Sequence, residues 1–437
     1  MTSRRLAPLV ALVMVLGAVG CGGDGAADGD SSSSSTTVPD HACRDAVASI
    51  VDATDRYVSG YEVAREIAAS DATATDPSTA TTSPAEGKEP LGEADFQSAL
   101  SEADAALRSS GCDPAETRDD LTEGLASVSA EGPVADAVLR QLAASMTGRM
   151  ARTPQVVTAA PGSDLRDVVS ALPDGSTVEL QAGEHRLDSS LVLLTGVTLR
   201  GTGRDATTLV STAPDAAVLA LTERRVELTG LTIRREGDAP GSAVLGGSAA
   251  SVVLSKARLT GGKADADGQG GAGVLMYASG EEGAGRGTTL EVTDTEVRDN
   301  QAAGIVLSGG HRASVVRATF ASNGQCGMCF LGASDGSVED STFDGNGLGV
   351  AATGTSKPGL LRLTITGGEV GVQAGDQAAP VIKDVTISAA RRAGLIYTGE
   401  AAGSIDGVTC DGVPFGIVVG PEAHPLLGQT SCELAGT

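Results

Sequence analysis

Residues 317–349 read RATFASNGQCGMCFLGASDGSVEDSTFDGNGLG and contain one short pattern twice. The heptad RATFASN begins at Arg317, and the matching heptad DSTFDGN begins 23 residues later, at Asp340. A glycine follows each heptad after a short interval, at Gly327 and at Gly349. A fixed short period is typical of a solenoid, in which each repeat forms one coil that stacks on the next. This stretch therefore predicts a coiled, repetitive fold.

The same period runs through the C-terminal part of the chain, from about residue 160 to residue 437. A glycine recurs every 22 or 23 residues, and a short strand-like segment precedes it. The recurring glycines are Gly304, Gly327, Gly349, Gly371, Gly394 and Gly416. Segments at Thr198, Thr232 and Arg258 fit the template with longer insertions, so we expect about ten coils of two or three strands each.

This region, about two thirds of the chain, resembles the right-handed parallel β-helix repeats of the pectate-lyase-like superfamily. The resemblance implies an all-β right-handed parallel β-helix over residues 160–437. It implies no single chemistry, because lyases, hydrolases, epimerases and binding proteins share this architecture.

The strand period assigns side chains to columns along the stack, because alternate residues of a strand face opposite ways. One column is predicted to point into the core: Val297, Phe320, Phe343, Ile365, Ile387 and Cys410. The neighbouring column is predicted to point outward: Thr319, Thr342, Thr364, Thr386 and Thr409. Asn300, Asn323 and Asn346 recur in the following turn, where an asparagine tolerates left-handed backbone and its amide can bond to the adjacent coil.

Four cysteines lie in the repeat region. Cys410 and Cys432 are one coil apart in the inward column, so we expect them to form a disulfide. Cys326 and Cys329 have the spacing of a redox or metal pair, but they follow no βαβ pattern. A local disulfide or a buried thiol pair is the favoured interpretation.

Residues 41–150 are predicted to form a small α-helical bundle that precedes the β-helix. Apolar residues recur at helical spacing in four segments, 42–68, 94–107, 116–128 and 133–150. Asp113-Pro114 and Pro133 are predicted helix starts, and residues 73–83 are a predicted loop. Cys43 and Cys112 are the cysteines of this module, and we expect them to form one disulfide that closes the bundle.

Residues 1–20 are predicted to be a signal peptide, with Arg4 and Arg5 before a short apolar run. The small residues before Cys21 resemble a bacterial lipobox, which implies that lipid is attached to this cysteine. Residues 21–40 are rich in Gly, Ser and Thr and predict a flexible tether. The sequence therefore predicts an extracytoplasmic protein anchored to the membrane by lipid, in a compartment where disulfides form.

Composition restricts the class of partner. The chain has 31 basic and 56 acidic residues, for a net charge of -25, which argues against a nucleic-acid partner. Aromatic residues are 2% of the chain and Trp is absent, so aromatic platforms for stacking sugars are scarce. We expect a monomer whose partner is a glycan or a protein of the cell envelope.

A second outward column lies two residues before the threonines and alternates in charge sign. Its members are Lys256, Asp294, Arg317, Asp340, Arg362 and Asp384. Stacked at one strand spacing, these charges would form a continuous ladder of ion pairs, which explains the pattern as structural. The same column is the candidate binding surface, with Lys256, Asp294, Asp340 and Asp384 as its binding residues.

The resemblance also implies an enzymatic alternative, a calcium-dependent polysaccharide lyase acting on a uronate-containing glycan. In that case Asp294, Asp340 and Asp384 would hold calcium, and Arg317 or Arg362 would remove the sugar proton. Pairing between the arginines and the aspartates argues against this, because it holds the arginines protonated. The favoured hypothesis is a binding or scaffolding β-helix module with no required cofactor; a spacer without a ligand is a third.

Overall fold

The computed structural model describes residues 37–71, 90–129, 132–151, 153–247, 250–268, 270–277 and 289–435, with the side chains of the first helix described at 41–60. Residues Pro39–Thr437 form one compact unit. The predicted signal peptide, Cys21, most of the tether and the loop at 73–83 lie outside the described residues. Among the residues that are described, no helix is long and apolar enough to cross a membrane.

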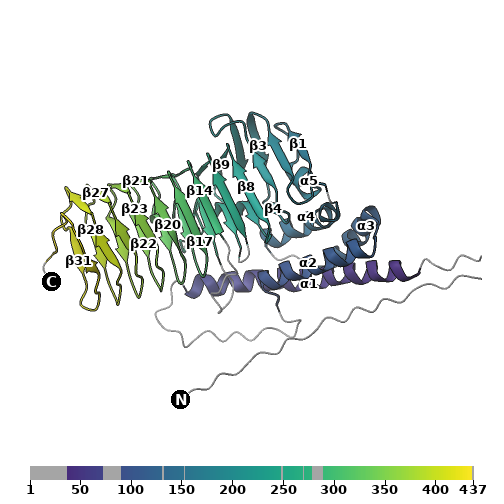
Figure 1. Cartoon of the computed structure of the whole chain (residues 1–437). Helices are drawn as coiled ribbons and strands as arrows, with labels where there is room; N and C mark the ends of the chain where they lie inside the picture. Colours follow the sequence, from purple (N-terminus) through teal and green to yellow (C-terminus); the bar gives the residue numbers. More distant parts are fainter. Residues whose placement is uncertain are drawn as a thin grey trace, which may run out of the picture. The chain divides into compact units, whose positions relative to one another are not determined.

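In the described part of the chain, four helices precede the repeats, as the sequence predicts (Figure 1): α1 (Thr37–Asp71), α2 (Glu93–Ser109), α3 (Pro114–Leu125) and α4 (Pro133–Met150). Asp113 caps α3 by accepting hydrogen bonds from the backbone N–H groups of Ala115 and Glu116, at 2.9 and 3.0 Å. The predicted Cys43–Cys112 disulfide is present. The first helix is longer than predicted, since it has 35 residues and begins inside the segment assigned to the tether.

The repeats form three parallel sheets whose strands stack along one solenoid (Figure 1). Sheet A contains β1 (Val156–Ala159), β2 (Thr177–Leu180), β5 (Thr198–Arg200), β8 (Arg225–Thr229), β11 (Ser251–Ser255), β14 (Thr289–Thr293), β17 (Arg312–Val316), β20 (Asp335–Glu339), β23 (Gly359–Leu361), β26 (Val381–Lys383), β29 (Ser404–Asp406) and β32 (Leu426–Leu427). Sheet B contains β3 (Gly183–Leu187), β6 (Thr207–Ser211), β9 (Thr232–Arg235), β12 (Arg258–Thr260), β15 (Glu296–Arg298), β18 (Thr319–Ala321), β21 (Thr342–Asp344), β24 (Thr364–Thr366), β27 (Thr386–Ser388) and β30 (Thr409–Asp411). Sheet C contains β4 (Leu191–Leu193), β7 (Asp215–Ala220), β10 (Gly241–Gly246), β13 (Val274–Met276), β16 (Ile305–Leu307), β19 (Cys326–Phe330), β22 (Leu348–Ala352), β25 (Val370–Ala374), β28 (Ala393–Tyr397) and β31 (Ile417–Val419). The short helix α5 (Leu165–Ser170) lies in sequence between β1 and β2.

The predicted inward column forms part of the core. Val297, Phe320, Phe343, Ile365 and Ile387 are at most 1% exposed. The rings of Phe320 and Phe343 stack at a centroid distance of 4.6 Å. The outward threonines are exposed, and two neighbouring pairs share hydroxyl hydrogen bonds of 3.3 Å. The period therefore predicted the facing of both columns.

The asparagine ladder is buried and continuous. Asn300, Asn323 and Asn346 are at most 2% exposed. The side-chain N–H of Asn300 donates to Asn323 Oδ1 at 2.9 Å, and that of Asn323 donates to Asn346 Oδ1 at 2.8 Å. The left-handed backbone belongs to the residue before each asparagine, such as Asp299 with φ 55° and Ser322 with φ 55°. The asparagine side chains thus form the hydrogen-bonded ladder, and the residues before them adopt the left-handed backbone of the turn.

Helices α2 and α4 cover the outer face of sheet C at its N-terminal end, where they pack against Val192, Leu219 and Leu245. Strand β4 is the edge strand of this sheet. The amide of Gln141 donates to Ser190 O at 2.9 Å and accepts from Val192 N at 3.1 Å, much as a neighbouring strand would. The helical module therefore protects an open edge, which is a recurrent need of solenoids.

The predicted cysteine pairs of the solenoid are both disulfides, Cys410–Cys432 at the last coil and Cys326–Cys329 within β19. Cys410 is only half-buried, although its column points inward. The local disulfide is therefore the correct interpretation of the Cys326–Cys329 spacing.

Tyr397 gives a first prediction about the core. Its side chain is fully buried, and its hydroxyl has no hydrogen-bond partner among the described residues. Burial also raises the pKa of the phenol. Because an unsatisfied buried hydroxyl costs about 1 to 3 kcal/mol, Tyr397→Phe should raise the free energy of unfolding by about 1 kcal/mol. Urea denaturation measures this change, and a loss of stability would show that the hydroxyl has a partner in solution.

Candidate functional site

The charged column lies at the turns from sheet A to sheet B, and every member has left-handed backbone. The φ values of Lys256, Asp294, Arg317, Asp340, Arg362 and Asp384 are between 50° and 55°. Glycines hold the same turn at the two ends of the row, Gly230 with φ 64° and Gly407 with φ 65°. A glycine would adopt this backbone without strain, so the charged side chains are present despite a conformational cost. We name these six residues the charged row.

Within the charged row, the arginines are held by the aspartates of the preceding coils. Arg317 donates from Nε to Asp294 Oδ1 at 2.7 Å and from Nη2 to Oδ2 at 3.1 Å. Arg362 bonds Asp340 in the same way, at 2.6 and 3.0 Å, and Glu339 at 3.0 Å. These hydrogen bonds lower the pKa of Asp294 and Asp340 and raise the pKa of both arginines.

The row is therefore not the continuous ladder that the alternating signs suggested. It contains two bidentate pairs, because each guanidinium donates hydrogen bonds to both oxygens of one aspartate and none to the aspartate of the next coil. Among the described residues, the side chains of Lys256 and Asp384 form neither an ion pair nor a hydrogen bond. The ends of the row are its chemically available parts.

The three aspartates do not fit a calcium site. Successive aspartates are two coils apart, about 10 Å at the usual strand spacing, and an arginine stands between them. Calcium needs six to eight oxygens around one point. In the part of the chain that the structure describes, no group of three His, Cys, Asp or Glu side chains could hold a metal. No chemical step can be assigned to calcium at this row.

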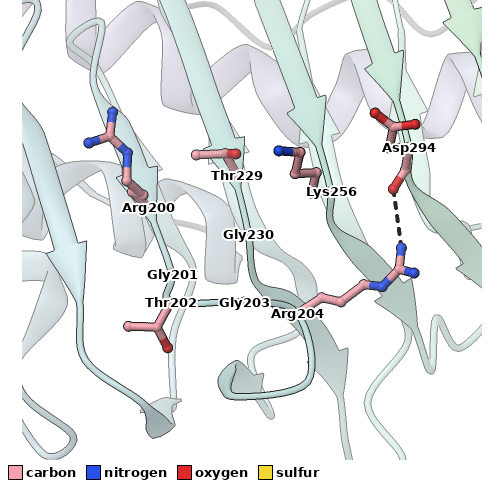
Figure 2. Close-up of a pocket in the computed structure, with 9 residues that line it drawn as sticks. All are labelled: Arg200, Gly201, Thr202, Gly203, Arg204, Thr229, Gly230, Lys256 and Asp294. Carbon is pink, nitrogen blue, oxygen red and sulfur yellow. Dashed lines mark hydrogen bonds between the residues drawn. The ribbon is translucent and has the colours of Figure 1, made fainter.

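A groove opens at the lysine end of the charged row (Figure 2). Its volume is about 490 Å³. The lining residues are Arg200, Gly201, Thr202, Gly203, Arg204, Thr229, Gly230, Lys256 and Asp294. Strand pairing sets Arg200 beside Thr229, and Thr229 beside Ser255, which precedes Lys256. Successive coils of a rigid stack thus supply the upper row of side chains in Figure 2.

Three cations line this groove. Arg204 Nη1 donates to the backbone oxygen of Asp294 at 3.1 Å, and its Nη2 lies 2.9 Å from Glu296 Oε1. Arg200 is 54% exposed and meets Glu179 only at 3.7 Å. Lys256 is exposed and acts on Asp294 through its charge, which lowers the pKa of that carboxyl after the larger effect of Arg317. The groove is a cationic spot on a chain of net charge -25.

The groove contains two residues that the sequence analysis selected, Lys256 and Asp294, and two that it missed, Arg200 and Arg204. Arg204 lies on the turn between β5 and β6, which is longer than the corresponding turns of later coils. A signal was present in the sequence, because the Gly201 to Gly203 insertion carries a basic residue on each side. The other row residues stay outside the groove.

Residues 272–420 match the family described as "Right handed beta helix region". This region is a right-handed β-helix. Most of the charged row, from Asp294 to Asp384, lies inside the matched part of the β-helix, whereas the cations of the groove lie before it. No curated protein matches the chain.

The β-helix is also similar to several solved structures, all at low identity. The ORF18 protein of Geobacillus virus E2 is 12% identical with a TM-score of 0.45, over 74% of this chain and 65% of that one. The catalytic domain of a GH87 alpha-1,3-glucanase in complex with nigerose is 10% identical with a TM-score of 0.39, over 64% and 70%. The A-module of an Azotobacter vinelandii mannuronan C-5 epimerase is 15% identical with a TM-score of 0.33, over 58% and 91%. This chain thus spans 65% of the viral protein's length.

Proposed function

We propose that this chain is a non-catalytic carbohydrate-binding β-helix module, held outside the cytoplasmic membrane by lipid on Cys21. The groove beside the charged row carries the proposal. It is a hollow of about 490 Å³ between stacked coils, lined by hydroxyl groups, cationic donors and glycine backbone. Such a surface offers hydrogen-bond donors to the oxygens of a sugar chain.

The engagement of both arginines that the sequence suggested as the base supports binding rather than catalysis. A lyase needs a group that accepts the sugar proton, and the candidates were Arg317 and Arg362. Both guanidinium groups are engaged by carboxylates, and both pKa values are raised by those hydrogen bonds. A guanidinium that is held protonated cannot act as the base.

The test uses the full chain carrying Cys21→Ser, which removes the site of lipid attachment and should release the protein from the membrane fraction. We would incubate it with polygalacturonate, alginate and neutral dextran, with and without calcium, and measure both binding and the ultraviolet absorbance of unsaturated sugar ends. We expect at least one polysaccharide to bind and none to be cleaved.

Two results would contradict this proposal. A rise in absorbance that depends on calcium and disappears in Arg317→Ala or Arg362→Ala would establish the lyase activity instead. Failure to retain any polysaccharide, while an envelope protein is captured at physiological salt, would make the module a protein-binding one.

A further inference from the structure

We propose that Arg200, Arg204 and Lys256 form a cationic subsite for neighbouring acidic groups of the bound glycan, carboxylates or sulfate esters. The inference rests on the proposed function, because it names the chemistry of the ligand at that same groove. Three cations from two coils line one hollow, Arg200 and Arg204 from the coil of β5 and Lys256 from the coil of β11, and a single carboxylate lines it as well. The effective dielectric constant near a protein surface is lower than in bulk water. A cation there therefore attracts a bound anion several times more strongly than it would in bulk water.

Lys256 is the cation left free for a ligand. Its side chain is exposed and forms no ion pair or hydrogen bond with any described residue. It has φ 51° at a turn where the preceding coil has Gly230. An ammonium group on a flexible stem has three N–H donors and can follow an anion of either shape, planar carboxylate or tetrahedral sulfate.

Arg204 is a preorganised cation. Its side chain is 33% exposed, and its guanidinium is fixed by the backbone oxygen of Asp294 and by Glu296. The backbone oxygen of Arg204 in turn accepts a hydrogen bond from the Thr232 hydroxyl at 2.6 Å. Because a guanidinium has five N–H donors, these contacts leave donors for a ligand. The groove therefore keeps one cation in place before binding, which reduces the ordering cost.

Arg200 is the third cation of the subsite and lies two strands from Lys256. Its contact with Glu179 is 3.7 Å long and both side chains are about half exposed, 54% and 48%. Exposed pairs of this kind contribute little, so the guanidinium can turn toward an anion at small cost. Arg200 and Lys256 are two strand spacings apart, about 10 Å, which lets them contact neighbouring parts of one polymer.

Asp294, the single carboxylate among the residues that line the groove, allows an experiment to show whether the groove binds an anion or a cation. Arg317 already donates hydrogen bonds to both carboxylate oxygens of Asp294, so this carboxylate is a poor ligand for a metal ion. Its negative charge repels a bound anion. Asp294→Asn removes that negative charge and should tighten the binding of an acidic polymer severalfold. If the groove held a cation instead, the same substitution would weaken binding.

The experiment measures the affinity of the full Cys21→Ser chain for matched acidic and neutral polymers. The probes are polygalacturonate oligomers and their methyl esters, which isolate the carboxylate, and dextran sulfate and dextran, which isolate the sulfate ester. Lys256→Gln should weaken binding of the acidic member of a pair about tenfold, and Lys256→Arg should restore most of it. The control is Lys383→Gln, an exposed lysine at the end of β26 in the same sheet, which should change nothing.

The outcomes separate this inference from the function on which it rests. If charged and neutral polymers bind equally and Lys256→Gln has no effect, the subsite is wrong and glycan binding stands. If Asp294→Asn weakens binding of the acidic polymer, the subsite is also wrong. If no polymer binds, but galacturonate or sodium sulfate raises the thermal midpoint of the chain and not of Lys256→Gln, the anion subsite stands and the glycan-binding function falls.

Discussion

Gly349→Ala should lower the free energy of unfolding by about 3 kcal/mol, at the upper end of the usual cost of overpacking. A Cβ at this position would lie 2.4 Å from the backbone oxygen of Gly371 and 2.8 Å from Ile365 Cγ2. The first of these atoms belongs to the backbone of the next coil, so relief requires two coils to move apart. Urea denaturation followed by far-ultraviolet circular dichroism measures the change.

The matched control is Gly359→Ala, in β23 of sheet A. There the nearest atom would be 3.4 Å away, in a flexible side chain, and the backbone has no left-handed conformation. This control should leave stability unchanged or raise it slightly, because alanine restricts the unfolded chain. Equal losses in the two variants would show that sheet propensity, and not crowding between coils, explains the recurring glycines.

This crowding is the physical reason that the sequence could predict the fold. The Cβ atoms that Gly304, Gly327 and Gly349 lack would each lie less than 3 Å from the glycine oxygen of the next coil. One close approach therefore imposes one glycine per coil from Gly304 onward, and the spacing of these glycines gives the number of residues in a coil. From that register, strand alternation gives the inward and outward columns without further information.

The groove could not be predicted in the same way. Arg200 and Arg204 belong to an early coil whose insertion breaks the period, so no register relates them to Lys256 in the sequence. The sequence also could not show which aspartate pairs with Arg317. This arginine is one strand from both Asp294 and Asp340, and the period makes the two neighbours equivalent. Side-chain geometry selects Asp294, and this choice leaves Lys256 available.

Contacts between distant segments were hidden for a related reason. Gln141 lies in a helix whose apolar pattern predicts burial but not what covers it. In the structure its amide bonds both Ser190 and Val192 at the edge of sheet C. A polar residue on a helix gives no sign in the sequence that its partner is a strand edge some 50 residues away.

Asn323→Ala should destabilise the β-helix by about 3 to 4 kcal/mol. The side chain is 1% exposed, accepts from Asn300 Nδ2 at 2.9 Å and donates to Val297 O at 3.0 Å and to Asn346 Oδ1 at 2.8 Å. Alanine removes one member of a buried chain of hydrogen bonds and leaves several polar groups without partners. Each such group costs about 1 to 3 kcal/mol, and partial access of water reduces the sum.

The control for this prediction is Gln325→Ala, two residues away in the same turn. The Gln325 side chain is exposed, so its removal should change the free energy of unfolding by less than about 0.5 kcal/mol. Hydrogen exchange adds a local measurement, since the backbone N–H of Asn300 donates to Asn323 Oδ1 at 3.3 Å and should lose protection in Asn323→Ala. If Asn323→Ala matched the control in both measurements, the ladder would be a consequence of the coil geometry and not one of its causes.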